Sequence, residues 1–131
     1  MVQVRDMKVH EADSVHALLA ANGWAHRLGS PQAFAALIAA SQRKAVAVTA
    51  QGEIVGFARA ITDGLSNGYL SMVVVAPTAR RQGIGRALVE QVMGSNPAIT
   101  WVLRAGRTDA AAFFAGLGFA ASTTAMEKPR A

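Results

Sequence analysis

A seven-residue segment in the middle of the chain, Arg80-Arg81-Gln82-Gly83-Ile84-Gly85-Arg86, has the composition of a phosphate-binding loop. It joins an apolar run, Tyr69–Val75, to a segment with helical periodicity, residues 84–93. The first N–H groups of a helix have no acceptor within the helix and carry partial positive charge, so they attract anions. The two glycines let a pyrophosphate approach the backbone, and the three arginines can add charge-assisted hydrogen bonds. The alternative is a glycine turn packed on the sheet, with its arginines in solvent.

Other phosphate loops fit this segment less well. A P-loop requires Gly-Lys-Ser or Gly-Lys-Thr, and the sequence contains neither. The dinucleotide-binding fingerprint requires a third glycine three residues after Gly85, and Leu88 occupies that position. The acidic residue of that fingerprint, about 20 residues further on, would fall near Arg104, which has the opposite charge.

The elements that must position this loop follow from apolar periodicity and turn residues. Tyr69–Val75 is apolar on both alternating faces, which predicts a central strand covered on both sides. The other expected elements, in chain order, are a strand at Val2–Arg5, a helix over 11–21, a helix capped by Ser30, a hairpin of Ala45–Ala50 and Ile54–Ile61, a helix over 84–93, a buried strand at Ile99–Leu103, a helix from Thr108 or Asp109 to about Leu117, and a last strand from Phe119. This order predicts an α/β fold with a mixed sheet between helices.

Length and composition predict a single domain spanning residues 1–131. Hydrophobic residues make up 52% of the chain and charged residues 16%, a balance typical of a packed core rather than of disorder. The chain has no cysteine, which excludes disulfides and thiolate sites and fits a cytoplasmic location. No apolar run reaches the ~18–20 residues of a membrane span, and the N-terminus does not resemble a signal peptide.

The chain carries a net charge of +5, and its densest cluster of cations surrounds the glycine loop rather than forming a stripe. The sequence also lacks an aromatic stacking platform and a basic recognition helix, so we expect no nucleic-acid partner. No set of His, Asp and Glu residues has metal-ligand spacing, so we expect no metal.

Residues 75–85, Val-Ala-Pro-Thr-Ala-Arg-Arg-Gln-Gly-Ile-Gly, resemble the coenzyme A motif of the GNAT superfamily of N-acyltransferases. Arg80, Gly83 and Gly85 match the fixed positions of that motif, Gln/Arg-x-x-Gly-x-Gly/Ala. Residues 112–119, Ala-Phe-Phe-Ala-Gly-Leu-Gly-Phe, resemble the final helix of the family. The resemblance covers residues 53–119. It implies a GNAT-like fold, in which a central and mostly antiparallel sheet of about six strands is flanked by about four helices.

The resemblance also implies substrates and binding residues. Acetyl-CoA would be the donor, and a primary amine of a small molecule would be the acceptor. The backbone of Met72, Val73, Val74 and Val75 would pair with the pantetheine arm as an added strand, and the amides of Arg81–Gly85 would hold the pyrophosphate. The amine would attack the thioester directly in a ternary complex, with the N–H of Met72 or Val73 stabilising the oxyanion.

Two positions near the final helix depart from the family pattern. The residue after Phe113 is usually a tyrosine that protonates the leaving thiolate, and Phe114, which we expect to contact acetyl-CoA, occupies that place. An asparagine expected just before the helix aligns with Arg107. Either water or another group protonates the thiolate, or the chain is a slow enzyme or a non-catalytic acyl-CoA sensor.

Three residues are candidates for the catalytic base or for contact with the acceptor. Asp63 lies at the end of a hairpin strand, although a turn residue beside a glycine is the simpler interpretation. Tyr69, on the key strand, could reach the acceptor or pack in the core. His26 lies between the two early helices, where the family usually forms its acceptor pocket, or is only solvated. Trp24 either lines that pocket or fills the core.

The acceptor itself is not identified by these residues. Few acidic residues are available to line a pocket, which argues against a polycationic acceptor such as an aminoglycoside. Exposed edges of mixed sheets often pair with a second copy, so a homodimer is one expected assembly.

Overall fold

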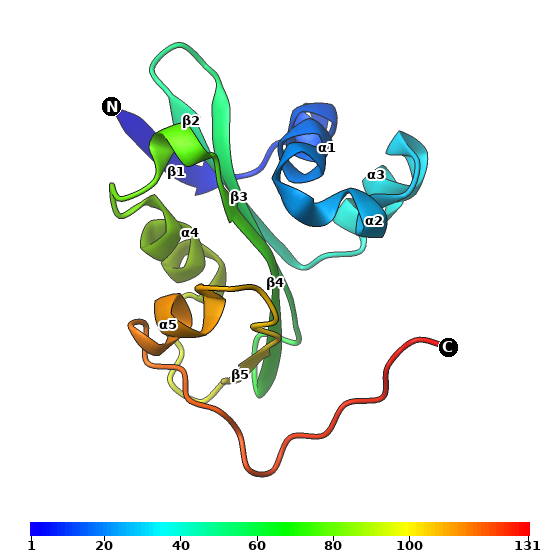
Figure 1. Ribbon diagram of the computed structural model, residues 1–131, viewed down its shortest axis with the longest axis vertical. Helices are drawn as coiled ribbons and strands as arrows, with labels where there is room; N and C mark the ends of the chain where they lie inside the picture. Colours follow the sequence, from blue (N-terminus) through cyan, green and yellow to red (C-terminus); the bar gives the residue numbers. More distant parts are fainter.

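The computed structural model describes residues 1–131 and contains a five-stranded sheet with helices packed on both of its faces (Figure 1). The strands are β1 (Val2–Asp6), β2 (Arg43–Thr49), β3 (Ile54–Thr62), β4 (Asn67–Val75) and β5 (Thr100–Leu103). The helices are α1 (Ala12–Leu19), α2 (Ala25–Leu28), α3 (Pro31–Ala39), α4 (Ile84–Met93) and α5 (Ala110–Ala115). Three short helical turns, η1 (Val9–Glu11), η2 (Ala20–Trp24) and η3 (Pro77–Ala79), lie between them.

The sheet is mixed, as the sequence predicts. Its strand order follows the chain from β1 to β5. Neighbouring strands from β1 to β4 are antiparallel, and β5 pairs in parallel with β4. A parallel pair requires a crossover connection, and α4 supplies it. At the start of α3, Ser30 accepts a hydrogen bond from Ala33 N at 3.1 Å, which confirms the predicted cap.

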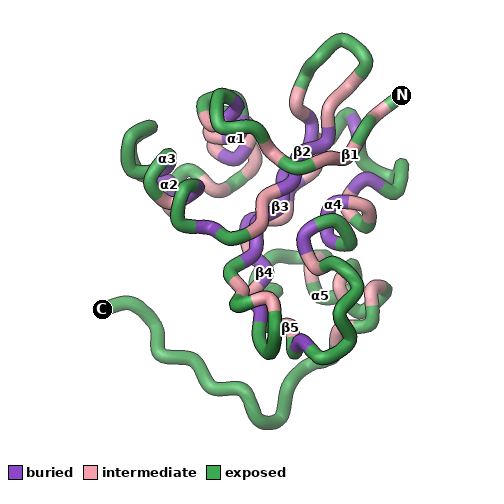
Figure 2. Tube along the Cα trace, turned by 180° about the vertical axis from the view of Figure 1, so that it is seen from behind, coloured by how far each residue is buried: buried purple, intermediate pink, exposed green.

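The β5 edge of the sheet differs from the prediction in two ways. We expected about six strands with Ile99–Leu103 buried, and the structure has five, with β5 at the edge and Val102 42% exposed. No strand follows Phe119, because its N–H bonds to Phe114 O at 3.0 Å and its ring packs edge-to-face on Phe114. The next residues, Ala-Ala-Ser-Thr-Thr-Ala, lack the alternating apolar pattern of a strand. The tail is accordingly exposed along its length (Figure 2).

Two apolar cores lie on opposite faces of the sheet. α4 and α5 cover one face, where Leu88, Val89 and Val92 of α4 are buried against the strands (Figure 1). α1, α2 and α3 cover the other face, where Phe34 and Phe57 are fully buried. Burying one large apolar side chain stabilises a fold by about 1.5–3 kcal/mol. The inner strands are therefore held from both sides, and Figure 2 shows many residues of β2 and β3 as buried.

A bulge interrupts β4 in its middle. Met72 and Val73 together lie opposite a single β3 residue, Ala58, and Met72 has a φ of +56°. The bulge reverses the alternation of the strand, because Leu70 faces the core under α4 whereas Met72 and Val74 face the core under α1–α3. The sequence predicts the strand but not the bulge, since no glycine marks the left-handed position.

An ion pair fixes the turn between β1 and α1. Arg5 donates to both carboxylate oxygens of Glu11, at 2.6 and 3.0 Å, and Lys8 N donates to the same carboxylate at 2.7 Å. Glu11 is only 7% exposed. The hydrogen bonds from Arg5 are the largest cause that lowers the pKa of Glu11 to about 2, and burial opposes them.

We predict that Glu11→Gln lowers the free energy of unfolding at pH 7 by about 2 kcal/mol, because it breaks a largely buried ion pair. The folded-state pKa lies below the ordinary value of 4.5, so this stabilisation is complete above about pH 4.5 and is lost as the pH falls toward 2. Urea unfolding across this pH range measures the loss. Glu53→Gln, at the exposed β2–β3 turn, is the control and should keep the wild-type pH dependence. A Glu11→Gln protein with the wild-type pH dependence would contradict the assignment.

Candidate active site

A cavity of about 310 Å³ lies against β4, beside the end of β5. β4 contributes Tyr69–Val73 to its wall. The other lining residues come from the α1–α2 connection, α2, the end of β5, the β5–α5 connection and α5: Gly23, Trp24, His26, Arg27, Leu103, Arg104, Gly106, Arg107, Ala110 and Phe114. Segments from both faces of the sheet therefore meet at one place on β4.

β4 loses its neighbour at this cavity. The pairing with β5 ends at Leu70 and Leu103, so β4 from Ser71 to Val75 has no strand on that side. A bulge also disrupts the ladder and leaves backbone groups for another partner. An extended ligand can therefore add to this edge as a further strand, through hydrogen bonds to the backbone of β4.

Met72 is held in a conformation that a non-glycine residue seldom adopts. A left-handed residue with a side chain costs about 1–2 kcal/mol relative to the usual helical region. The side chain of Met72 is 5% exposed and belongs to the core under α1–α3, so packing holds the residue in place. Backbone strain of this kind concentrates at functional sites.

The glycine loop between β4 and α4 presents an open set of amide donors. The backbone N–H groups of residues 81–86 donate to no protein acceptor, and the first hydrogen bond of α4 runs from Ala87 N to Gly83 O at 3.1 Å. Arg81 and Gly83 have φ values of +65° and +78°, which turn the chain into the helix. No protein atom lies within 4 Å of the position that a Cβ on Gly83 would take. The loop therefore fits an anion such as a pyrophosphate.

Other side chains of the loop have different surroundings. Arg80 donates to the last carbonyl of β4 at 3.0 Å, and Arg86 donates to Gly116 O at 3.1 Å. Gly85 makes room for α5, since a Cβ there would lie 3.0 Å from the ring of Phe113. The sequence predicts that Gly85 lets a phosphate approach the backbone. In the structure, Gly85 also allows α5 to pack closely against α4.

The remaining three loop residues contribute in two ways. The side chains of Arg81 and Gln82 are exposed and have no protein partner, so they can meet a ligand. Ile84 is 6% exposed and packs in the core under α4, so only its backbone N–H is available to an anion.

Phe114 forms an apolar wall of the cavity. Its ring packs edge-to-face on Phe113 and Phe119, with centroid distances of 4.9 and 5.8 Å. Such aromatic pairs stabilise by about 0.5–1.5 kcal/mol each beyond their buried area. The position at which the family pattern has a tyrosine therefore supplies packing and no ionisable proton.

The three candidate catalytic residues do not lie together. His26 and Tyr69 line the cavity, whereas Asp63 does not. The carboxylate of Asp63 accepts hydrogen bonds from the backbone N–H groups of residues 65–67 and from the Ser66 hydroxyl. The Ser66 hydroxyl and these amides hold the pKa of Asp63 well below its usual range. A carboxylate held in this way is a weak base, and its visible role is to order the β3–β4 loop.

Arg107 joins two walls of the cavity, a contact that the sequence does not predict. Its guanidinium donates to Asn22 O at 2.5 Å and lies 5.2 Å from the ring centroid of Trp24. Gly23 has a φ of +93° and leaves room for Arg107, which a Cβ at this position would overlap. The Asn-Gly pair is the one sequence signal of this turn, and nothing in the sequence indicates its partner.

Trp24 has both of the roles that the sequence leaves open. It lines the cavity and also packs against the core under α1–α3. Its indole Nε1 is buried and has no hydrogen-bond acceptor. An unpaired buried donor costs about 1–3 kcal/mol.

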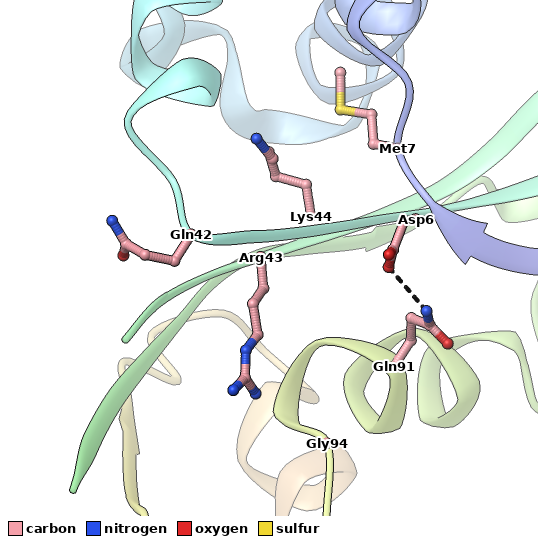
Figure 3. Close-up of a pocket in the computed structure, with 7 residues that line it drawn as sticks. All are labelled: Asp6, Met7, Gln42, Arg43, Lys44, Gln91 and Gly94. Carbon is pink, nitrogen blue, oxygen red and sulfur yellow. Dashed lines mark hydrogen bonds between the residues drawn. The ribbon is translucent and has the colours of Figure 1, made fainter. Parts of the chain in front are cut away.

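A second hollow, of about 480 Å³, lies at the start of β2 and is lined in part by Asp6, Arg43, Lys44 and Gln91 (Figure 3). Its polar side chains already have protein partners. Arg43 donates to the last two carbonyls of α4, at 3.0 and 2.8 Å, and Gln91 donates to Asp6 at 2.8 Å. Arg43 thereby satisfies the C-terminus of α4. None of the predicted site residues lines this hollow, which we interpret as structural.

Two further features bear on the kind of site. No group of three or more His, Cys, Asp or Glu side chains is placed to bind a metal ion. None of the helices combines the length and the apolar character that crossing a membrane requires.

The sequence matches the family model of the GNAT acetyltransferase domain over residues 8–129. The chain therefore belongs to the GNAT acetyltransferase family, which confirms the resemblance carried by its coenzyme A motif. No curated protein sequence matches the chain significantly.

Several solved structures superpose on nearly the whole chain. A GNAT-family protein from Xanthomonas campestris pv. campestris has a TM-score of 0.82 at 23% identity, covering 99% of this chain and 94% of its own. An aminoglycoside acetyltransferase from an uncultured soil metagenomic sample has a TM-score of 0.72 at 21% identity, covering 100% and 99%. A glucosamine-6-phosphate N-acetyltransferase from Arabidopsis thaliana has a TM-score of 0.74 at 14% identity, covering 98% of each chain. At these identities the likeness establishes the fold.

We predict that Asp63→Asn leaves the pH dependence of acetyl transfer unchanged, because Asp63 lies outside the cavity. The amide oxygen of asparagine can still accept from the loop N–H groups, although more weakly than a carboxylate, so the melting temperature should fall slightly. His26→Gln and Tyr69→Phe, both within the cavity, are the matched variants. Loss of the acidic limb of the pH–rate profile in Asp63→Asn alone would instead identify Asp63 as the base.

Proposed function

We propose that the protein transfers an acetyl group from acetyl-CoA to a primary amine of a small molecule. The observation that carries this proposal is that a free strand edge and a loop of free amides follow each other along one segment of the chain. The unpaired edge of β4 from Ser71 to Val75 leads, through η3, into the open amides of residues 81–86. An extended pantetheine arm suits the edge, and a pyrophosphate suits the amides.

Two of the similar proteins support an amine acceptor. One is an aminoglycoside acetyltransferase and the other a glucosamine-6-phosphate N-acetyltransferase. Their acceptors differ in charge, since an aminoglycoside is polycationic and glucosamine-6-phosphate carries a phosphate. The class of acceptor must therefore be argued from the residues of this chain.

In the proposed reaction the nitrogen of a neutral amine attacks the carbonyl carbon of the thioester. The C–S bond then breaks, so the products are an N-acetylated amine and the thiolate of coenzyme A. The nitrogen loses one proton and the thiolate gains one. The cavity holds both reactants together, which replaces an encounter in solution by a step within one complex. Met72 and Val73 line the cavity at the bulge, and their N–H groups are candidates to stabilise the oxyanion.

The proton transfers involve few groups of the cavity. Tyr69 and His26 are the side chains that could take the proton of the amine, directly or through water. Phe114 has no proton to give, so the thiolate leaves unprotonated or is protonated by water. A thiol with an ordinary pKa of about 8.5 is a fair leaving group. Loss of a general acid typically lowers the rate by ~10²–10⁴-fold, so we expect slow turnover.

The apolar side chain of Phe114 favours a second candidate function, an acyl-CoA sensor that binds the donor without transferring its acetyl group. The two functions share the donor site and differ in turnover. Release of the coenzyme A thiol that depends on an added amine would exclude the sensor.

The cellular location and the assembly of the protein are a further part of the proposal. We propose a cytoplasmic protein that forms a homodimer and has no nucleic-acid or membrane partner. The absence of cysteine fits a reducing compartment. The edge strand β5, where Val102 is 42% exposed, offers backbone groups for pairing with a second copy.

The donor site is tested by Gly83→Trp with Gly52→Trp as its matched control. Both glycines have positive φ, +78° and +85°, and neither has a protein atom within 4 Å of its Cβ position. Tryptophan therefore adds similar strain and bulk at either site, but only Gly83 lies in the amide loop. By calorimetry we expect Gly52→Trp to bind acetyl-CoA as wild type does, and Gly83→Trp to bind at least about 100-fold more weakly.

Two results would contradict the donor site. If wild type binds no acetyl-CoA, both the transferase and the sensor are wrong. If Gly83→Trp binds as tightly as Gly52→Trp, the pyrophosphate does not lie in the glycine loop.

A further inference from the structure

The cavity beside β4 has walls of cations and hydrogen-bond donors and contains no carboxylate. Arg27, Arg104, Arg107 and His26 line it, and no Asp or Glu does. A concave site lined by one sign of charge raises the local concentration of ligands of the opposite sign. This lining is therefore unsuited to an acceptor with several ammonium groups and suited to one that carries an anion.

Two of the three arginines have no anionic partner in the protein. Arg104 forms an ion pair with Glu127 at 2.6 Å, so its charge is compensated. Arg107 donates to a backbone carbonyl, that of Asn22, and forms no ion pair. Arg27 is half-buried and makes neither a side-chain hydrogen bond nor an ion pair. Arg27 and Arg107 thus keep donors for a ligand.

Trp24 lies beside Arg107 in the lining of the cavity. Its Nε1 donor is buried without an acceptor, and the residue lines the cavity beneath the guanidinium of Arg107, 5.2 Å from its ring centroid. Buried donors in proteins are nearly always paired. Arg27 lines the same cavity, so two uncompensated guanidinium groups face one space and indicate a site for an anionic group.

These cations are separate from the loop assigned to the pyrophosphate. The cavity touches β4 at residues 69–73, and none of residues 80–86 lines it. A strand rises about 3.3 Å per residue, so the loop beyond Val75 lies further along the same strand. The donor's pyrophosphate therefore leaves Arg27 and Arg107 unused.

We propose that the acceptor amine carries an anionic group, a phosphate or a carboxylate, and that Arg27 and Arg107 bind this group in the cavity. The inference rests on the proposed acetyl transfer and specifies the class of its acceptor. A guanidinium binds either anion through two parallel N–H···O hydrogen bonds, which fixes orientation as well as position. Because Met72 and Val73 line the same cavity, an acceptor anchored by its anion presents its amine close to the bulge.

Four short primary amines test the proposal. O-phosphoethanolamine carries a phosphate, β-alanine a carboxylate, ethanolamine a neutral hydroxyl and 1,3-diaminopropane a second ammonium. With wild type we expect kcat/KM for the better anionic amine to exceed that for ethanolamine by about 10- to 100-fold, the gain expected of charge-assisted hydrogen bonds. The diamine should be the poorest substrate. The ranking of the two anionic amines identifies the phosphate or the carboxylate as the recognised group.

Variants assign the effect to the two arginines. Arg27→Gln and Arg107→Gln should each lower kcat/KM for the anionic amine by about 10-fold or more, mainly through KM, and should lower kcat/KM for ethanolamine far less, while the affinity for acetyl-CoA is kept. Arg27→Glu should move the preference toward the diamine, a change that a purely structural role would not produce. Arg27 makes no hydrogen bond that its replacement would break, so the Arg27 variants should fold, whereas Arg107→Gln also loses the hydrogen bond to Asn22 O. Lys128→Gln, in the exposed tail, removes one charge away from the cavity and is the control.

Contradicting results separate this inference from the transferase itself. If wild type acetylates ethanolamine as well as both anionic amines, the anion site is wrong while acetyl transfer stands. If the arginine variants lose acetyl-CoA affinity instead, the cations serve the donor, and the inference is also wrong. If no amine is acetylated, acetyl transfer fails, and titration of O-phosphoethanolamine and β-alanine into the acetyl-CoA complex decides the site. The anion site is then wrong if wild type binds neither anionic amine, or if Arg27→Gln binds them as tightly as wild type does.

Discussion

The rest of the site depends on one constraint in β4, the bulge at Met72 just beyond the point where β5 stops pairing. A fifth strand in full register would cover the edge of β4 and leave no backbone to bind a substrate. Instead the pairing ends at Leu70, and the strand continues to Val75 with one side free. The left-handed conformation at Met72 costs about 1–2 kcal/mol. The core under α1–α3 buries the Met72 side chain and so compensates for this cost.

Helices from both faces of the sheet then complete the site around this strand. α4 begins where the glycine loop ends, so its unpaired amides lie beyond the free edge of β4. α5 places the ring of Phe114 against the cavity, and the α1–α2 connection places Trp24 there. Arg107 links these two walls by reaching Asn22 O. Two groups of donors therefore lie along β4. The free amides of residues 81–86 follow its end, and the arginines of the cavity lie beside its middle.

The sequence predicts the parts of this arrangement that local chemistry determines. The helix over 84–93 begins and ends as expected, because a glycine precedes it and Gly94 follows it. The cap of α3, the β2–β3 hairpin and the glycine loop are also local, and each is present. The coenzyme A motif identified the family because its spacing reflects one strand, one loop and one helix in succession.

Contacts between residues far apart in the chain determine the other features of the site, and no local sequence pattern indicates these contacts. The bulge lies at Met72, where a glycine would have marked it, and Arg107 meets a carbonyl 85 residues away in the chain. The predicted last strand fails because Phe119 packs back on α5. Of the three catalytic candidates, His26 and Tyr69 line the cavity. The carboxylate of Asp63 instead accepts hydrogen bonds within the β3–β4 loop.

We infer that acetyl-CoA binds along the free edge of β4 and in the amide loop. Amide hydrogen exchange of the wild-type protein, measured with and without saturating acetyl-CoA, tests it most directly. We predict slower exchange at residues 72–75 and 81–86 in the complex, and unchanged exchange at the β2–β3 turn, residues 50–53. Slower exchange around Arg43, with unchanged exchange in β4 and the loop, would show that acetyl-CoA binds elsewhere.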